Sequence, residues 1–376
     1  MFERLKHMLI KEFIEIFRDP RMKSIIFVTP VLQIIIFGYA VNTDVDKVAT
    51  AIYDLDNSVV SRELTARFEL SGYFAIKSRI GDERQMRELL DRGEVEAVLK
   101  VNKGFGNDLR AGKTALVQII VDGTDSNTAG IVLDYSSRIT GRFSREVLEA
   151  RFLRTLGPAK KPGRVDLAAR AWFNENLESR NFYVPGVISL LVMVITIMLT
   201  SMAVVREKEM GTMEQIMVTP IKPGEFILGK TIPFMLIGFM DVILISLVAV
   251  FWFEVPIRGN PVVLLVSAGL YLMTTLGIGL FISTISRTQQ QAMMTTFFFI
   301  LPASLLSGFV FPVANMPEVV QWSTLLNPMA YFLVIIRGVF LKGVGIDVLW
   351  PQMMGLFILG VVTLWVTVKR FKKTLS

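Results

Sequence analysis

The first group of residues with the spacing to do chemistry matches a phosphate-binding loop. Residues 224–231 read GEFILGKT, which fits the P-loop pattern G-x-x-x-x-G-K-[S/T]. A working P-loop follows a buried strand and uses small residues, so that its backbone N–H groups can wrap phosphate. Here Pro220 and Pro223 precede the match, bulky residues fill it, and an apolar run containing Pro233 follows. We therefore interpret Lys230 as an anchor at the end of that run.

The second group is the charged segment 206–220, REKEMGTMEQIMVTP, which separates two apolar runs that are each long enough to cross a bilayer. Hydrocarbon excludes its charged side chains, so the segment is expected in water at a membrane face. Those side chains are Arg206, Glu207, Lys208, Glu209 and Glu214. Thr212 can cap a short helix on which Met213, Ile216 and Met217 share one face. The segment is either a short helix that binds a partner or an ordinary solvated loop.

A third candidate is a single acid, Asp241, near the middle of the second of these runs. An ionised acid at that depth costs about 2.5–3.5 kcal/mol on insertion scales, so it should face protein or a water-filled path. Proton coupling, contact with a cationic substrate, and a hydrogen bond to a neighbouring Ser or Thr all remain open. The chain has no cysteine and one histidine, which excludes disulfides, cysteine-based metal sites and thiol catalysis.

The composition identifies a membrane protein. The 376 residues are 52% hydrophobic and their mean hydropathy is +0.52, which is too apolar for a soluble domain of this size. Six apolar runs approach the ~20 residues needed to span a bilayer core. They are residues 24–41, 183–205, 231–253, 262–285, 292–311 and 348–368. The net charge of +7 comes from basic residues that flank these runs, so no nucleic-acid partner is expected.

Residues 1–20 form the pattern of an amphipathic helix that lies in the membrane interface and ends at Asp19-Pro20. The basic residues predict the orientation, because cytoplasmic segments are enriched in Lys and Arg. They are concentrated on the side that carries both chain termini, whereas the short connections on the other side hold only Arg258, Arg337 and Lys342. Both termini are therefore expected in the cytoplasm, with residues 43–182 outside.

Residues 43–182 have the character of a soluble domain. Short strands are predicted at 47–54, 73–77, 94–101 and 114–122, and helices near 58–69, 82–92 and 126–156. This alternation predicts a mixed α/β domain, followed by a basic linker rich in Pro and Gly. The segment lacks the residues of a catalytic set, so its role is either substrate gating and partner docking or that of a passive cap.

A last segment, 312–343, joins the fifth and sixth runs. Its apolar stretch is broken by prolines and is too short to cross, which predicts a re-entrant pair that dips into the outer leaflet and returns. The residues that punctuate it are Pro312, Pro317, Asn327 and Pro328.

The charged segment resembles the cytoplasmic coupling loop of ABC-2 type exporter permeases, where R-E-(K/R)-E-x-G-T-x-E recurs between membrane spans. The pieces F-x-F-P-x-x-x-M-P and N-P-M-x-Y of segment 312–343 are similar to the end of that membrane domain, where such helices line the exit of the substrate path. The resemblance implies that a separate ATPase subunit binds the coupling helix, 206–220. The coupling residues implied are Arg206, Glu207, Lys208, Glu209, Gly211, Thr212, Glu214 and Pro220.

By this resemblance the fold is an all-α membrane bundle of six transmembrane helices with an inserted extracytoplasmic mixed α/β domain. Residues 183–376 would be the ABC-2 transmembrane domain, in a bacterial inner membrane. The implied function is efflux of drug-like or other amphipathic substrates by a permease subunit that is not an enzyme. ATP and Mg²⁺ would bind the partner ATPase, and further partners would be a second permease copy or paralogue and a periplasmic adaptor. A non-transporting receptor or scaffold, and a secondary transporter, are the alternatives.

Overall fold

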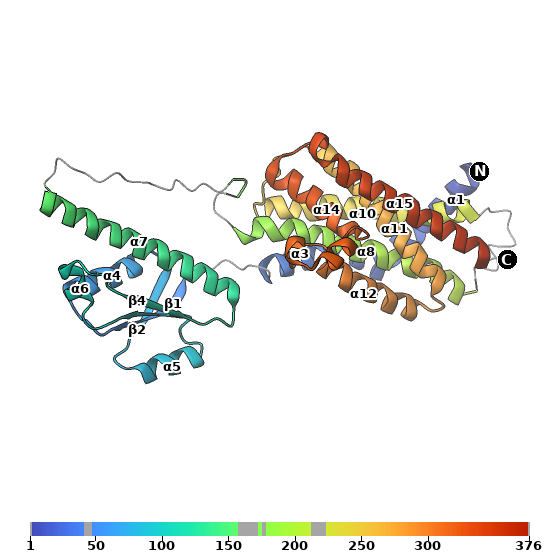
Figure 1. The fold of residues 1–376 in the computed structure, drawn as a ribbon. Coiled ribbons are helices and arrows are strands. Elements are labelled where there is room, and N and C mark those ends of the chain that lie inside the picture. The colour runs from blue at the N-terminus through green and yellow to red at the C-terminus, as the bar shows by residue number, and fades with distance from the viewer. Residues whose placement is uncertain (1, 41–46, 157–171, 175–177, 212–222, 375–376) are drawn as a thin grey trace. The chain divides into compact units, whose positions relative to one another are not determined.

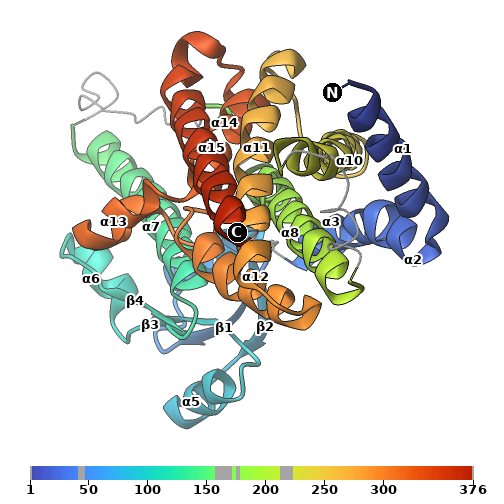
Figure 2. The ribbon, with the colours of Figure 1, turned by 90° about the vertical axis from the view of Figure 1, so that its right-hand side faces the viewer.

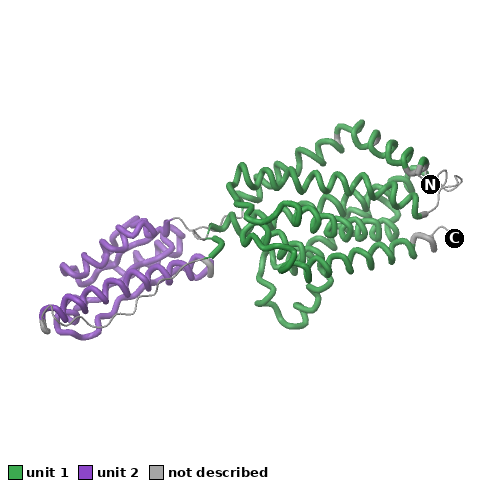
Figure 3. Tube along the Cα trace, turned by 90° about the horizontal axis from the view of Figure 1, so that it is seen from above, with its two compact units in different colours: residues 1–42, 170–376 green, residues 43–169 purple. Residues whose placement is uncertain are grey.

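The structure is a computed structural model that describes residues 2–40, 47–156, 172–174, 178–211 and 223–374. The chain divides into two compact units (Figure 3). Unit 1 comprises residues 1–42 and 170–376, and unit 2 comprises residues 43–169. Each unit has its own hydrophobic core.

Unit 1 is a helical bundle (Figure 1). Its first helices are α1 (Phe2–Arg18), α2 (Pro20–Lys23), the π-helix η1 (Ser24–Val28) and α3 (Thr29–Ala40). The long helices are α8 (Ser179–Glu209), α10 (Pro223–Phe251), α11 (Pro261–Ile285), α12 (Gln289–Leu305) and α15 (Ile346–Thr374). Between the last two lie the short elements η2 (Val313–Asn315), α13 (Glu318–Thr324), α14 (Pro328–Arg337) and η3 (Gly338–Lys342).

Four of the predicted spans are confirmed as helices that are long and apolar enough to cross a membrane: α8, α10, α11 and α15. The other two predicted spans are not among these four helices. Helix α12 has 17 residues and contains Pro302 near its end. The first span is divided between η1 and the 12-residue α3. Pro30 lacks a backbone N–H, and just before it the Thr29 N–H reaches back to Ser24 in a wide π-turn.

Helix α8 contacts α3, α10, α11, α12 and α14, so it is the central helix of unit 1 (Figure 2). Small polar side chains join it to its neighbours. Thr196 donates to Thr275 of α11 over 3.0 Å, and Ser201 lies 3.0 Å from Thr296 of α12. Such bonds satisfy hydroxyl groups that would otherwise be buried in an apolar bundle.

Helix α13 and the continuous helix Pro328–Lys342, formed by α14 and η3, are bent by 81° relative to each other. The second helix of this pair is held at the end of the bundle where α8 begins. Arg337 donates to the carbonyls of Phe182, at the start of α8, and Gly308, just after α12. The backbone N–H of Arg258, between α10 and α11, donates to the Phe340 carbonyl of η3.

Unit 2 holds a four-stranded sheet of order β2-β1-β3-β4. Its strands are β1 (Val48–Asp54), β2 (Phe74–Arg79), β3 (Ala97–Val101) and β4 (Val117–Val121). Strand β1 pairs in parallel with β2 and β3, and β3 pairs antiparallel with β4. All four predicted strands are confirmed within a few residues at each end.

Helices cover both faces of this sheet. Helices α4 (Val59–Leu70), α6 (Phe105–Ala111) and α7 (Ser126–Leu156) pack in one core around Phe68 and Leu99. Helix α5 (Glu83–Asp91) packs through Met86 on the opposite face. The predicted helices α4, α5 and α7 are confirmed. The short helix α6 was not predicted.

Candidate functional site

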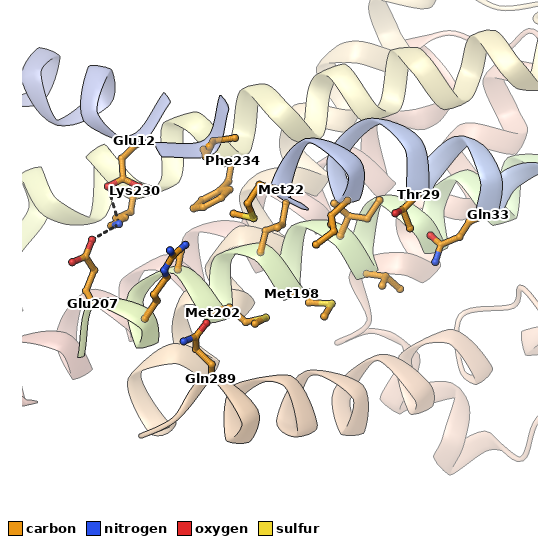
Figure 4. Close-up of a pocket in the computed structure, with 17 residues that line it drawn as sticks. Glu12, Met22, Thr29, Gln33, Met198, Met202, Glu207, Lys230, Phe234 and Gln289 are labelled. Atoms are coloured by element: carbon orange, nitrogen blue, oxygen red, sulfur yellow. Dashed lines mark hydrogen bonds and ion pairs between the residues drawn. The ribbon is translucent and has the colours of Figure 1, made fainter. Parts of the chain in front are cut away.

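A buried cluster of charges joins three helices at the end of unit 1 that carries both termini of the bundle (Figure 4). Lys230 of α10 places its Nζ 2.7 Å from Glu12 Oε1 of α1 and 2.8 Å from Glu207 Oε1 of α8. The side chains of all three are at most 4% exposed. Because buried charges are tolerated only when they are paired, this cluster fixes α1 against α8 and α10.

Lys11 completes the cluster from its exposed side. Its Nζ lies 3.1 Å from Glu207 Oε1 and 3.8 Å from Glu12 Oε1, and its side chain is 54% exposed. Two carboxylates thus share two ammonium groups. Since Lys11 reaches solvent and Lys230 does not, Lys230 is the buried cation of the cluster, and its loss would remove a buried partner from both carboxylates.

The charged residues that end α8 hold the turn between α11 and α12. Lys208 donates to the carbonyl of Ser283, in the last turn of α11, over 2.8 Å. Glu209 accepts from the backbone N–H of Gln289, the first residue of α12, over 2.9 Å. A cation therefore lies at a helix C-terminus and an anion at a helix N-terminus, which is the favourable arrangement for both helix dipoles.

The structure thus describes residues 206–211 of the predicted coupling segment, six of its fifteen residues. Arg206 is half-buried beside the cavity described below, Glu207 points into the ion cluster, and Gly211 has a φ of 70° after the helix ends. The remaining predicted coupling residues lie outside the described residues. They are Thr212, Glu214 and Pro220. A role in binding an ATPase stays a prediction for the whole set. The Glu207 side chain itself is buried and contacts Lys230 of the same chain.

The P-loop match lies in a helix. Residues 224–231 belong to α10, where the Thr231 hydroxyl donates to the Ile227 carbonyl over 2.7 Å. A Cβ on Gly229 would lie 2.4 Å from the sulfur of Met8, so this glycine allows α1 to approach α10 closely. After the first turn the backbone N–H groups bond within the helix. Lys230 and Gly229 therefore serve the packing of α1 on α10.

A cavity of about 210 Å³ opens beside the ion cluster. Its wall is mostly apolar and is formed by α1, α2, η1, α3, α8, α10 and the start of α12. Met22, Met198, Met202 and Phe234 line it (Figure 4). Glu207 and Lys230 lie at one end, and Thr29 and Gln33 lie further along. Arg206 also lines the cavity. Methionine side chains adapt to guests of different shape, so this cavity suits an apolar or amphipathic molecule.

Asp241 is buried in α10, with 1% of its surface exposed. Its Oδ2 has no hydrogen-bond partner among the residues that the structure describes. Of the three roles that the sequence left open, a hydrogen bond from a neighbouring Ser or Thr to this oxygen is therefore not observed. The other two roles stay untested.

The four predicted exit residues punctuate the bent pair. Pro312 and Pro317 precede η2 and α13, and Pro328 begins α14. Asn327 accepts from the Met329 N–H over 3.1 Å and donates to the Ala303 carbonyl of α12 over 2.7 Å. Asn327 thus caps α14 and ties the bend to α12.

These observations define a helical integral membrane protein with an apolar cavity beside a buried ion cluster. The chain belongs to the ABC-2 transporter family, because residues 21–369 match the family described as ABC-2 family transporter protein. This confirms the resemblance drawn from the charged segment. Members of the family are permease subunits, which are not enzymes themselves, and they dimerise and work with ABC ATPase partners.

Similar proteins cover nearly the whole chain. The probable multidrug ABC transporter permease YbhR of Escherichia coli (strain K12) is 31% identical over 363 residues, which are 96% of each chain. The probable multidrug ABC transporter permease YbhS of the same organism is 34% identical over 91% of this chain and 89% of its own. The inner membrane transport permease YhhJ, also from strain K12, is 28% identical over 94% and 96%.

Sequence reasoning missed the partners of Lys230. Glu12 lies four residues from both Met8 and Ile16, so on a helix it shares their inward face. Two features together predict such a pair: an acid on the inward face of one helix, and a lysine at the end of an apolar run in another.

Proposed function

We propose that this chain is the permease subunit of an ABC-2 exporter for drug-like or other amphipathic molecules, driven by a separate ABC ATPase. Two copies, or this chain with a related permease, would form the transmembrane path. ATP and Mg²⁺ would bind the ATPase. The names of the relatives YbhR and YbhS as multidrug permeases support this substrate class.

The observation that carries the proposal is the attachment of residues 207–209 to four other helices, α1, α10, α11 and α12. Glu207 reaches α1 and α10 through Lys230, and Lys208 and Glu209 hold the α11–α12 turn. A force applied to the segment after Gly211 would therefore move these helices together. Because α8, α10 and α12 contribute to the cavity wall, such a movement changes the cavity. A nucleotide-dependent contact here would shift the balance between two packed states.

We further propose the membrane topology predicted above: six spans, both termini in the cytoplasm, and residues 43–182 outside, where they could bind a periplasmic adaptor. The bent pair fits a re-entrant hairpin, since its two helices are bent by 81° and Arg337 of the second helix bonds to the end of the bundle where α8 begins and α12 ends. In this topology the ion cluster faces the cytoplasm and the hairpin faces the exterior.

The double variant Lys208→Ala/Glu209→Ala tests coupling, because it removes the contacts to the α11–α12 turn and leaves the buried cluster in place. Reconstituted with its ATPase, this variant should bind the ATPase and lose most export of a fluorescent amphipathic substrate. The control is Arg84→Ala/Glu88→Ala, which likewise removes one cation and one anion, here an exposed ion pair in unit 2. Export at the wild-type rate by the Lys208/Glu209 variant would contradict the proposal.

A further inference from the structure

A second cavity lies on a different side of unit 1 from the cavity beside the ion cluster. It has a volume of about 620 Å³ and is formed by α11, α12, α13 and α15. Its wall is almost wholly apolar and includes Phe281, Phe298, Val362 and Val366. Phe298 is 82% exposed, so the cavity opens towards the surroundings of the bundle.

The mouth of this cavity at the end that carries the termini has a cation beside it. Val362, Val366 and Arg370 are spaced four residues apart and so lie on one face of α15. The Arg370 guanidinium lies 5.7 Å from the centroid of the Phe281 ring, and Phe281 lines the cavity. The apolar wall therefore leads directly to a positive charge.

The dimensions of this arrangement fit one leaflet of a bilayer. From Val362 to Arg370, α15 rises by about 12 Å at ~1.5 Å per residue. Half of a hydrocarbon core of ~30 Å is roughly 15 Å. An open apolar cavity at membrane depth is filled by lipid tails, since water gains no hydrogen bonds there.

We propose that this cavity binds an anionic phospholipid, with an acyl chain along α12 and α15 and the phosphate beside Arg370. The far end of the cavity contains Leu326 and Asn327, at the bend between α13 and α14. The bound chain therefore contacts the bent pair, and occupancy stabilises the contact of Asn327 with Ala303. Placement in the cytoplasmic leaflet rests on the proposed topology, whereas binding itself requires neither that topology nor the ATPase.

Native mass spectrometry of the intact permease tests this proposal, with phosphatidylglycerol and phosphatidylcholine of identical acyl chains added after delipidation. The wild type should retain phosphatidylglycerol in preference. Val362→Trp fills the cavity and should lower that retention by about tenfold. Val361→Trp is the control, because Val361 is equally exposed, at 47% against 49%, and does not line the cavity. Thr295→Trp fills the cavity from α12 if Val362→Trp fails to fold.

A charge variant separates specific binding from general attraction. Arg370→Gln should weaken retention of phosphatidylglycerol by roughly fivefold, the effect of one cation near an anionic surface. Lys369→Gln removes a neighbouring charge that lies over Trp365, outside the cavity, and should have a smaller effect. The proposal would be overturned by equal effects of Arg370→Gln and Lys369→Gln, by equal effects of Val362→Trp and its control Val361→Trp, or by equal retention of both lipids. Loss of a permease dimer in Val362→Trp, with lipid retention unchanged, would instead assign the cavity to a second copy.

Discussion

Lys230 lies 2.8 Å from Glu207, and both side chains are buried between α8 and α10. Glu207 and Lys230 are 23 positions apart in the sequence, on either side of the segment that joins α8 to α10. Their contact therefore holds these two helices together. Through Glu12 the same lysine also holds α1. The base of the predicted coupling segment is therefore rigidly attached to the bundle.

Lys230→Met should destabilise unit 1 strongly. It removes the buried cation that lies between two buried carboxylates, and breaking a buried ion pair from one side costs about 3–5 kcal/mol. Lys11→Met should cost at most about 1 kcal/mol, as exposed pairs do. Thermal unfolding in detergent measures both. Glu12→Gln/Glu207→Gln added to Lys230→Met should restore part of the stability, and a stable Lys230→Met single variant would refute the cluster.

Glu207→Ala and Glu214→Ala should affect different properties of the permease, its stability and its export activity. Glu207→Ala removes a buried partner of Lys230, so it should lower the thermal unfolding temperature. Glu214→Ala should leave that temperature unchanged and reduce export, because Glu214 belongs to the part of the coupling segment proposed to bind the ATPase. Unfolding temperature and ATPase co-purification, measured side by side, distinguish these effects. An unaltered unfolding temperature in Glu207→Ala would contradict its buried position.

Asp241→Leu should raise the thermal stability of the permease. The carboxyl is buried in a membrane-capable helix, and its Oδ2 has no hydrogen-bond partner among the described residues. Removing such a group avoids its desolvation. Asp241→Asn, which keeps the shape, serves as the control. If both variants transport normally, the acid has no part in proton coupling or in binding a cationic substrate; if both fold and lose export, it has such a part.

Asp56 should make unit 2 sensitive to acid. A hydrogen bond with Ser58 and the backbone N–H groups of Gly106 and Gly104, at 2.9 and 2.8 Å, lower the pKa of its carboxyl. A depressed folded-state pKa stabilises the fold above the unfolded value of about 3.9, and the effect is lost as the pH falls through the folded value.

The measurement is hydrogen exchange of the α6 amides in urea at pH 7 and pH 3. Protection should fall between these values in the wild type. In Asp56→Asn protection should be lower at pH 7, and the change with pH should be smaller. An identical change with pH in both proteins would exclude Asp56 as its source.

Local patterns in the sequence predicted most of the fold. The apolar runs that became α8, α10, α11 and α15 are long, and the alternating strands of unit 2 have clear boundaries. The fifth run was predicted to end at residue 311, but α12 ends at Leu305, just after Pro302. Helix α6, with seven residues, is too short to show a helical period.

The site was predicted less completely, because its contacts join residues far apart in the chain. The pattern REKE marked the end of α8, which the structure confirms at Glu209, but it could not show that Glu207 turns inward. That position depends on Glu12 and Lys230, and a single sequence does not reveal which distant charges pair. Asn327 and Pro328 were predicted as exit residues, a role that stays a prediction. The structure shows them as the N-cap and first residue of α14, a local pattern that a sequence can display.

Cross-linking from the coupling segment tests the central claim most directly. The chain has no cysteine, so Met213→Cys introduces a single reactive thiol without further changes. In membranes that contain the complete transporter, this thiol should cross-link to the ABC ATPase with a yield that changes on ATP addition. It should also resist a membrane-impermeant maleimide added from outside. Labelling from outside, or a cross-link yield to the ATPase no higher than that of a Val361→Cys control in α15, would contradict the account.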